Sequence, residues 1–169
     1  LEIMYSLNPS FLLGVSASYL SAQAQLLYTG NILFSIVRMD GEITVNNILV
    51  PLLAGFNYRG ELQGGLVKMD LGLFAGYGIA LQQNTVKITT AGNPELHSTE
   101  LQGGSFVLEL RTKTIFKLDW FTFGINFGYR HAIVPGLEYT AKSGSLFDNT
   151  EIGSTLIDSE NDPIVFDYS

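Results

Sequence analysis

The stretch from Val67 to Leu81 alternates without interruption between apolar residues and a set rich in glycine and charge. Its odd positions read Val, Met, Leu, Leu, Ala, Tyr, Ile, Leu, and its even positions read Lys, Asp, Gly, Phe, Gly, Gly, Ala. Successive side chains of a β-strand point to opposite faces, so the pattern predicts one strand with a continuous apolar face. At ~3.3 Å per residue this strand would extend about 50 Å. Soluble strands usually end near ~5–6 residues and a tilted membrane-spanning strand needs ~9–11, so the pattern favours a transmembrane β-barrel.

The same alternation recurs along most of the chain. Five further strands are predicted at Phe11–Tyr19, Ala24–Ile36, Ile48–Arg59, Ser105–Phe116 and Phe121–Arg130, and two weaker ones at Glu2–Ser6 and Pro163–Tyr168. The sequence therefore predicts an all-β fold, an eight-stranded antiparallel up-and-down transmembrane β-barrel, forming a single domain over residues 1–169. Neither a glycine-rich first strand nor a closing strand with a C-terminal aromatic residue is recognisable, so we expect a barrel that is clipped at both ends.

The connections between these strands are expected to alternate in length. Short turns are predicted at Leu20–Ala22, Gly60-Glu61 and Leu118-Asp119, and long loops at Arg38–Glu42, Gln83–Glu100 and Ala132–Asp162. Short turns on one side and long loops on the other are typical of outer-membrane barrels, and any recognition is expected on the long loops. Pro51 lies inside a predicted strand and has no amide donor, so we expect a bulge or an unpaired position there.

Composition narrows the class of protein. Only 15% of the residues are charged, against ~25% in an ordinary soluble domain. The net charge of −7 argues against nucleic acid as a partner, and the absence of cysteine excludes disulfides and thiolate sites. No apolar run reaches the ~18 residues that a membrane helix requires.

The alternation assigns each side chain to one of the two faces of the predicted barrel wall, and it places several aromatic residues near the ends of the strands. A polar network is expected in the barrel lumen, formed by Arg59, Lys68, Asp70, Glu109, Arg111, Lys113, Asn126 and Arg130, with Asp70 and Glu109 neutralised by Lys68, Arg111 and Lys113. The lipid-facing set is Val67, Met69, Leu71, Leu73, Phe121, Phe123, Ile125 and Phe127. Interfacial aromatic residues are expected at Tyr19, Tyr58 and Trp120 on the periplasmic side and at Tyr129 near the other.

Alternation alone is also compatible with a soluble, lipocalin-like barrel that binds an apolar ligand inside. Three features favour the membrane. The polar face is rich in glycine and offers little for water to solvate, whereas small residues suit the narrow interior of an eight-stranded barrel. The charges on that face have both signs, as a paired interior requires. The aromatic residues cluster at strand ends.

Several short motifs resemble the PorT-like outer-membrane β-barrel family. They are Gln25-Leu26-Leu27-Tyr28-Thr29-Gly30, Ile48-Leu49-Val50-Pro51-Leu52-Leu53-Ala54-Gly55-Phe56-Asn57-Tyr58, Leu71-Gly72-Leu73-Phe74-Ala75-Gly76-Tyr77-Gly78 and Phe127-Gly128-Tyr129-Arg130, the last with its two final residues reversed. The resemblance covers roughly Pro9 to Ala132. It implies an eight-stranded barrel in the outer membrane of a diderm bacterium, in a family some of whose members are tied to secretion or transport.

Candidate chemistry is sparse. Some outer-membrane enzymes that modify lipid place a histidine and a serine two residues apart, but two residues after His131 stands Ile133. His97 has no second ligand at metal-binding spacing. We therefore expect no catalytic residue, no metal and no cofactor, and a non-enzymatic barrel whose partners are outer-membrane lipids, lipopolysaccharide and a protein bound through the loops.

Overall fold

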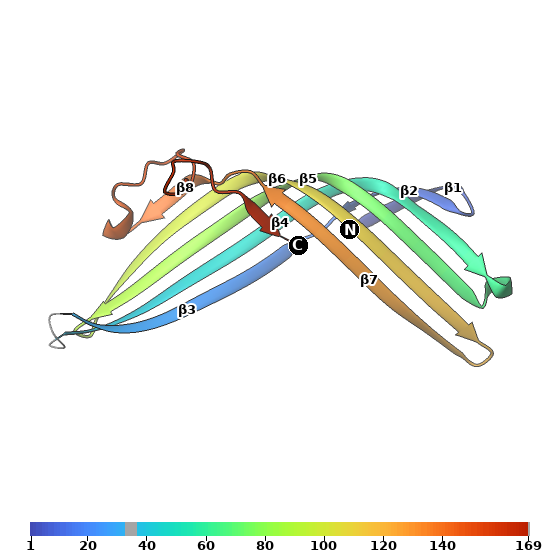
Figure 1. Cartoon of the computed structure of the whole chain (residues 1–169), viewed down its shortest axis with the longest axis horizontal. Coiled ribbons are helices and arrows are strands. Elements are labelled where there is room, and N and C mark those ends of the chain that lie inside the picture. The colour runs from blue at the N-terminus through green and yellow to red at the C-terminus, as the bar shows by residue number, and fades with distance from the viewer. Residues whose placement is uncertain (33–36, 169) are drawn as a thin grey trace.

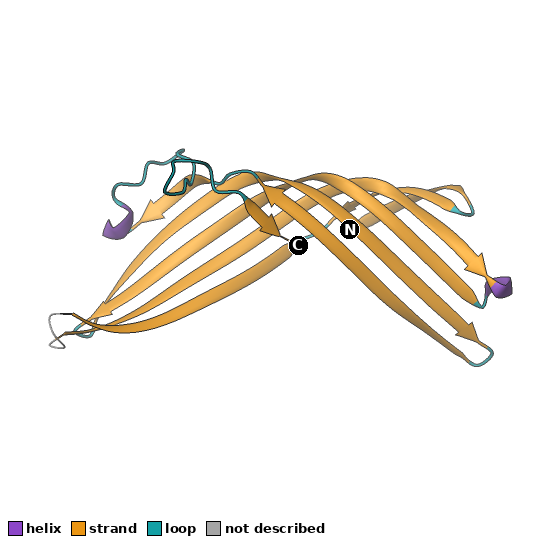
Figure 2. Cartoon of the chain, viewed as in Figure 1, coloured by secondary structure: helices purple, strands orange, loops and turns teal. Residues whose placement is uncertain are grey.

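The structure, a computed structural model, describes residues 1–32 and 37–168, and its fold is a single antiparallel β-sheet (Figures 1 and 2). Its nine strands are β1 (Glu2–Asn8), β2 (Phe11–Ala17), β3 (Leu20–Ile32), β4 (Val37–Leu62), β5 (Val67–Thr90), β6 (Asn93–Leu118), β7 (Phe121–Val134), β8 (Glu138–Ser143) and β9 (Phe166–Tyr168). Two short 3-10 turns, η1 (Gln63–Gly65) and η2 (Ser145–Phe147), complete the described elements. The predicted all-β antiparallel fold is confirmed, with nine strands where the sequence predicts eight. The sheet of the described residues is open.

Within the described part of the chain, no helix is long and apolar enough to cross a membrane.

Three strands run the full length of the arched sheet. β4 and β6 have 26 residues each and β5 has 24, so each passes from one end of the molecule to the other (Figure 1). The loops predicted at Arg38–Glu42 and Gln83–Glu100 are wrong, because both segments lie in these strands apart from the two-residue turn Ala91-Gly92. β5 and β6 are joined by a tight hairpin in which Ala91 and Gly92 have φ of 51° and 85°. Positive φ at both central residues is the geometry of a two-residue hairpin turn.

At two places across the width of the sheet, two strands that follow one another in the chain lie end to end along the same neighbouring strand. β2 pairs with Leu52–Tyr58 of β4, and β3 continues in the same direction along Val37–Leu49. β7 and β8 likewise follow one another along β6. The turn predicted at Leu20–Ala22 is therefore wrong, because the chain does not reverse there. The predicted loop Ala132–Asp162 is wrong in part, since it contains the end of β7 and all of β8.

Pro51 lies at the point where β2 gives way to β3. Its carbonyl accepts a 3.4 Å hydrogen bond from the amide of Ser18, so the edge of Pro51 that lacks an N–H faces the gap between the two strands. The expected unpaired position is confirmed. On its other side Pro51 pairs with Gly78, and Gly78 pairs with Ser105. These four residues define a boundary row across the sheet, just short of the point where β7 ends.

The boundary row divides the long strands into two halves. We call the half with the turns at η1 and between β6 and β7 the proximal half, and the half with β3, β8 and the β5–β6 hairpin the distal half; they lie on the right and left of Figure 1. The side of the sheet that carries Leu53 and Phe74, each 1% exposed, is the inner face. The opposite side, which carries Leu52 at 64% and Leu108 at 47%, is the outer face.

The two halves distribute apolar residues in opposite ways. In the proximal half the outer face is apolar and exposed, as at Leu71, Phe106 and Ile125. In the distal half the outer face stays apolar for the first residues beyond the boundary row, at Val50, Ile79 and Leu81, and then becomes polar. Its residues there include Gln25, Glu42, Thr44, Asn46, Gln83, Thr85, Lys87, Ser98 and Glu100, with Leu27 and Leu96 as exceptions. The apolar residues of these strands move to the inner face, where they include Leu26, Ile43, Val45, Val86, Ile88 and Leu101.

The segment between β7 and β9 folds back over the inner face near the boundary row. Leu137, 1% exposed, packs with Ala80, Leu101 and Val134, and this cluster is extended by Tyr139. The backbone passes so close that a Cβ on Gly103 would lie 2.2 Å from the carbonyl oxygen of Gly136. Only glycine therefore permits this covering segment to reach the sheet.

Candidate functional site

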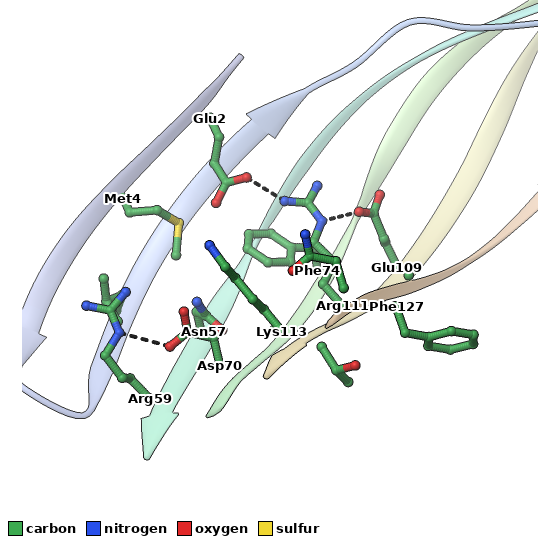
Figure 3. Close-up of a pocket in the computed structure, with 15 residues that line it drawn as sticks. Glu2, Met4, Asn57, Arg59, Asp70, Phe74, Glu109, Arg111, Lys113 and Phe127 are labelled. Carbon is green, nitrogen blue, oxygen red and sulfur yellow. Dashed lines mark hydrogen bonds and ion pairs between the residues drawn. The ribbon is translucent and has the colours of Figure 1, made fainter. Parts of the chain in front are cut away.

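The inner face of the proximal half carries a network of ion pairs centred on Glu109. This side chain is 8% exposed and stands between two guanidinium groups, Arg111 on β6 and Arg130 on β7. Figure 3 shows Glu109 beside Arg111. Nε of Arg130 donates a 2.6 Å hydrogen bond to Glu109 Oε2, and Nε of Arg111 donates to Oε1. Two cations compensate the one buried carboxylate, as burial of an ionised group requires.

Arg111 also connects this network to the other edge of the sheet. Its Nη1 donates to Glu2 on β1 at 2.6 Å, its Nη2 donates to Ser16 on β2 at 3.0 Å, and its guanidinium lies 4.6 Å from the centre of the Phe74 ring. β1 and β6 are separated by four lateral steps, about 19 Å in a flat sheet. One arginine side chain can cover that separation only because the sheet curls around its inner face.

A second group of charges lies nearer the turns of the proximal half. Arg59 Nε donates a 2.9 Å hydrogen bond to Asp70, and Lys68 pairs with Glu61 across the β4–β5 hairpin. Members of both groups line a polar cavity of about 610 Å³: Glu2, Glu109 and Arg111 from the first, and Arg59 and Asp70 from the second (Figure 3). Lys113 and Asn126 also contribute to its lining. In the described part of the chain the side chain of Lys113 makes no hydrogen bond or ion pair.

All eight residues predicted for the polar network lie on the inner face of the proximal half, but the predicted pairing is partly wrong. Of the three proposed partners, only Arg111 neutralises a predicted carboxylate; Asp70 is held by Arg59 and Lys68 by Glu61. The sequence reasoning also missed Glu2 and Glu61. Alternation already places Glu2 on the inner side of its strand, and the β4–β5 register puts Glu61 directly opposite Lys68.

The predicted lipid-facing residues all lie on the outer face of the proximal half. Val67 is half-buried and the other seven are exposed, from Leu73 at 38% to Phe127 at 61%. Of the predicted interfacial aromatic residues, Trp120 lies in the β6–β7 turn and is 88% exposed. Tyr19 is misplaced by the prediction, because it follows Ser18 at the boundary row and so lies at the opposite end of the apolar face from Trp120.

Neither histidine belongs to a recognisable catalytic arrangement. His131 Nδ1 lies 3.2 Å from Asp167 Oδ1, within ion-pair distance but without hydrogen-bond geometry. The hollow beside His131 is lined by Ala75, Gly76, Tyr77, Phe106, Val107, Leu108 and Ile133, and none of these is a serine, threonine or cysteine. Among the described residues no group of three or more His, Asp or Glu side chains could hold a metal ion.

No known protein family, curated protein or solved structure matches this chain.

Proposed function

We propose that this chain is an integral outer-membrane β-barrel protein with a side-chain-filled polar interior, whose role is structural or interactive rather than enzymatic. The observation that carries the proposal is the exposed apolar outer face of the proximal half. Exposed residues there include Leu52, Leu71, Phe106, Ile125 and Phe127, which together form a patch far larger than isolated surface apolar residues. Hydrocarbon is the solvent in which such a face is stable.

The extent of this face suits a bilayer. On β5 the apolar outer positions run from Val67 to Leu81, about 50 Å along the strand or about 35 Å of depth at a 45° tilt. That spans the ~30 Å hydrocarbon core. Beyond Leu81 the outer face turns to Gln83, Thr85 and Lys87, as expected where water replaces lipid.

Closure into a barrel follows from strand direction. The nine strands occupy seven lateral positions, and six antiparallel steps lead from β1 to β9, so β1 and β9 run in the same direction. Single-chain bacterial barrels have an even number of antiparallel strands. We therefore propose that the working barrel has an eighth lateral strand, antiparallel to both β1 and β9.

A soluble, lipocalin-like barrel fits less well. It would bury its apolar face and expose its charges, whereas here Leu71 and Phe127 are exposed and Glu109 is buried with two arginines. The proposed partners are outer-membrane lipids around the proximal half and lipopolysaccharide at its rim. Since Gln83–Glu100 forms strands rather than a loop, any protein partner would meet the distal half and the segment after β7. The resemblance to the PorT-like family supports the same location, in a diderm bacterium.

The test measures how deep each half lies in a bilayer. In a Trp120→Phe background, tryptophan is introduced on the outer face of β5 either as Leu73→Trp or as Thr85→Trp, and each variant is reconstituted into vesicles containing brominated lipids. We expect bromine placed deep in the acyl chains to quench Leu73→Trp strongly and to leave Thr85→Trp bright.

Two results would refute the proposal. Equal quenching of the two variants would mean that the outer face does not cross a lipid boundary. A chain that stays monodisperse without detergent and does not float with vesicles would identify a soluble protein.

A further inference from the structure

A second, apolar cavity of about 200 Å³ lies just beyond the boundary row, away from the charged network. Its inner-face walls are Leu20 and Ala22 of β3, Leu49 of β4, Ala80 of β5 and Leu137 of the segment after β7, and two carboxamides, Asn47 and Gln82, complete them. Ala80 is 6% exposed and Leu137 is 1% exposed, whereas Leu20 on β3 is 39% exposed, so the cavity is open along its β3 wall. An apolar cavity of ~150 Å³ in a protein can stay dry and bind a small apolar molecule, so this one has sufficient room.

The two carboxamides distinguish this cavity from a packing defect. Asn47 and Gln82 are direct cross-strand partners, and Oδ1 of the first and Oε1 of the second are buried without a hydrogen-bond partner. The orientation of Gln82 is fixed, because its Nε2 donates to Asn84 Oδ1 at 2.9 Å, and Asn84 in turn donates to Thr99. Buried polar atoms are nearly always paired, so two neighbouring unpaired acceptors call for a donor.

The chemistry of the lining defines that donor. None of the residues that line the cavity is charged, so an ammonium group would be buried without a counter-charge. A neutral hydroxyl supplies one proton to an acceptor and carries no charge. The terminal torsion of Asn47 is soft, so its Oδ1 can turn toward such a group, whereas the hydrogen bond to Asn84 holds the carboxamide of Gln82.

We infer that this cavity binds a small neutral aliphatic alcohol, or the hydroxyl-bearing end of a longer chain, with Asn47 and Gln82 accepting from the hydroxyl and Leu49, Ala80 and Leu137 enclosing the alkyl part. A longer chain would continue over the apolar inner face of the distal half, toward Val45 and Val86. The site goes beyond the proposed function and does not depend on it, since its walls are formed by strands already paired in the open sheet.

The test is photolabelling with 3-azioctanol, compared with a diazirine alkane of equal length that lacks the hydroxyl, in the medium that keeps the chain monodisperse. Mass spectrometry then maps the labelled residues. We expect the alcohol to label the cavity-lining segments of β3, β4 and β5, and to label them about three- to tenfold more than the alkane does, the effect of one hydrogen bond. The double variant Asn47→Leu, Gln82→Met should reduce alcohol labelling to the alkane level.

Ala80→Phe fills the cavity and should abolish labelling there by both probes. Its matched control is Ala75→Phe, which adds the same ring to the same strand on the outer face and should leave labelling of the cavity unchanged. Equal labelling by alcohol and alkane in the unmodified chain would overturn the proposal, as would labelling that persists in Ala80→Phe. If Ala80→Phe does not fold, the double variant decides, since it keeps the cavity and removes only the acceptors.

Discussion

The proximal and distal halves of the sheet share the same three long strands but present opposite faces to their surroundings. Along β5 the apolar positions are odd up to Leu81 and even from Val86 onward, while the backbone pairing with β4 and β6 continues without a register shift. The strand register therefore does not distinguish the two halves. If the proximal half lies in a membrane as proposed, the difference teaches that the solvent around each half, and not the strand register, decides which residues lie outside.

The inner faces of the two halves also differ in polarity, and the difference is the reverse of that between the outer faces. In the proximal half the inside holds Glu109, Arg111 and Arg130, whereas in the distal half it holds Ile43, Val86 and Leu101. A polar interior is stable behind a lipid-facing wall only if its charges are paired, and an apolar interior is what a water-facing wall requires. Each half thus has the interior that its proposed surroundings require, and we expect substitutions at equivalent positions in the two halves to have unequal effects.

The largest expected difference is between two glutamates on β6. Glu109→Gln removes the carboxylate that compensates Arg111 and Arg130, and breaking a buried pair in this way costs about 3–5 kcal/mol of unfolding free energy. Glu100→Gln changes an exposed residue whose partner is Gln83, and should cost less than about 0.5 kcal/mol. Urea unfolding of the reconstituted chain measures both. Similar losses would show that the proximal inner face is as hydrated as the distal outer one.

Next in size is arginine placed on the outer face of β5. Leu71→Arg puts a charge at the centre of the proposed lipid-facing strand and should cost about 2–4 kcal/mol. Gln83→Arg, twelve residues along the same face, faces water beside Glu100 and should cost about 0–1 kcal/mol. Unfolding free energies in lipid vesicles test the pair. If Leu71→Arg is tolerated as well as Gln83→Arg, the boundary between the two media does not lie between them.

Substitutions at two glycines, Gly76 in the proximal half and Gly41 in the distal half, test the difference in curvature between the halves. A Cβ on Gly76 would lie 2.1 Å from the carbonyl oxygen of Leu52, a backbone atom that cannot move away easily. A Cβ on Gly41, in the distal half, would meet the ring of Tyr28, which can rotate. Gly76→Ala should therefore cost about 1–3 kcal/mol or more and Gly41→Ala less than about 1 kcal/mol, as measured by chemical unfolding. The reverse order would place the tightest curl in the distal half.

The proximal half could be predicted from sequence to a large extent. Strict alternation located β2, β5 and β7 and assigned Leu71 and Phe127 to the same face, and the missing amide of Pro51 predicted an unpaired position. The distal half could not be predicted in this way, because the apolar residues switch from one face of the strand to the other at Asn46-Asn47 and at Gln82-Gln83. Such a change interrupts the alternation on each face, so a strand that continues through it is mistaken for a loop.

The ion pairs of the inner face were only partly predictable for a different reason. Alternation shows which side chains share a face, but the partner of each depends on register and on curvature. Lys68 and Glu61 flank one hairpin, and a known register would have paired them. Arg111 and Glu2 are 109 residues apart and meet only because the sheet curls, which no local pattern encodes.

The smallest expected effect concerns the covering segment of the distal half, and it depends on pH. Burial raises the pKa of the Tyr139 phenol above its ordinary value, because the anion is poorly solvated beside Ala80 and Leu137. Below about pH 10 the phenol is neutral in both folded and unfolded chains, so its contribution to stability is complete. As the pH rises further the unfolded chain loses this proton first, and stability falls until the folded pKa is passed. Tyr139→Phe should remove this component, so the difference in unfolding free energy between the two chains should change above pH 10 and stay constant between pH 7 and 9. A difference that is flat across the whole range would mean that the covering segment is open to water, and that the apolar inner face beneath it is not closed.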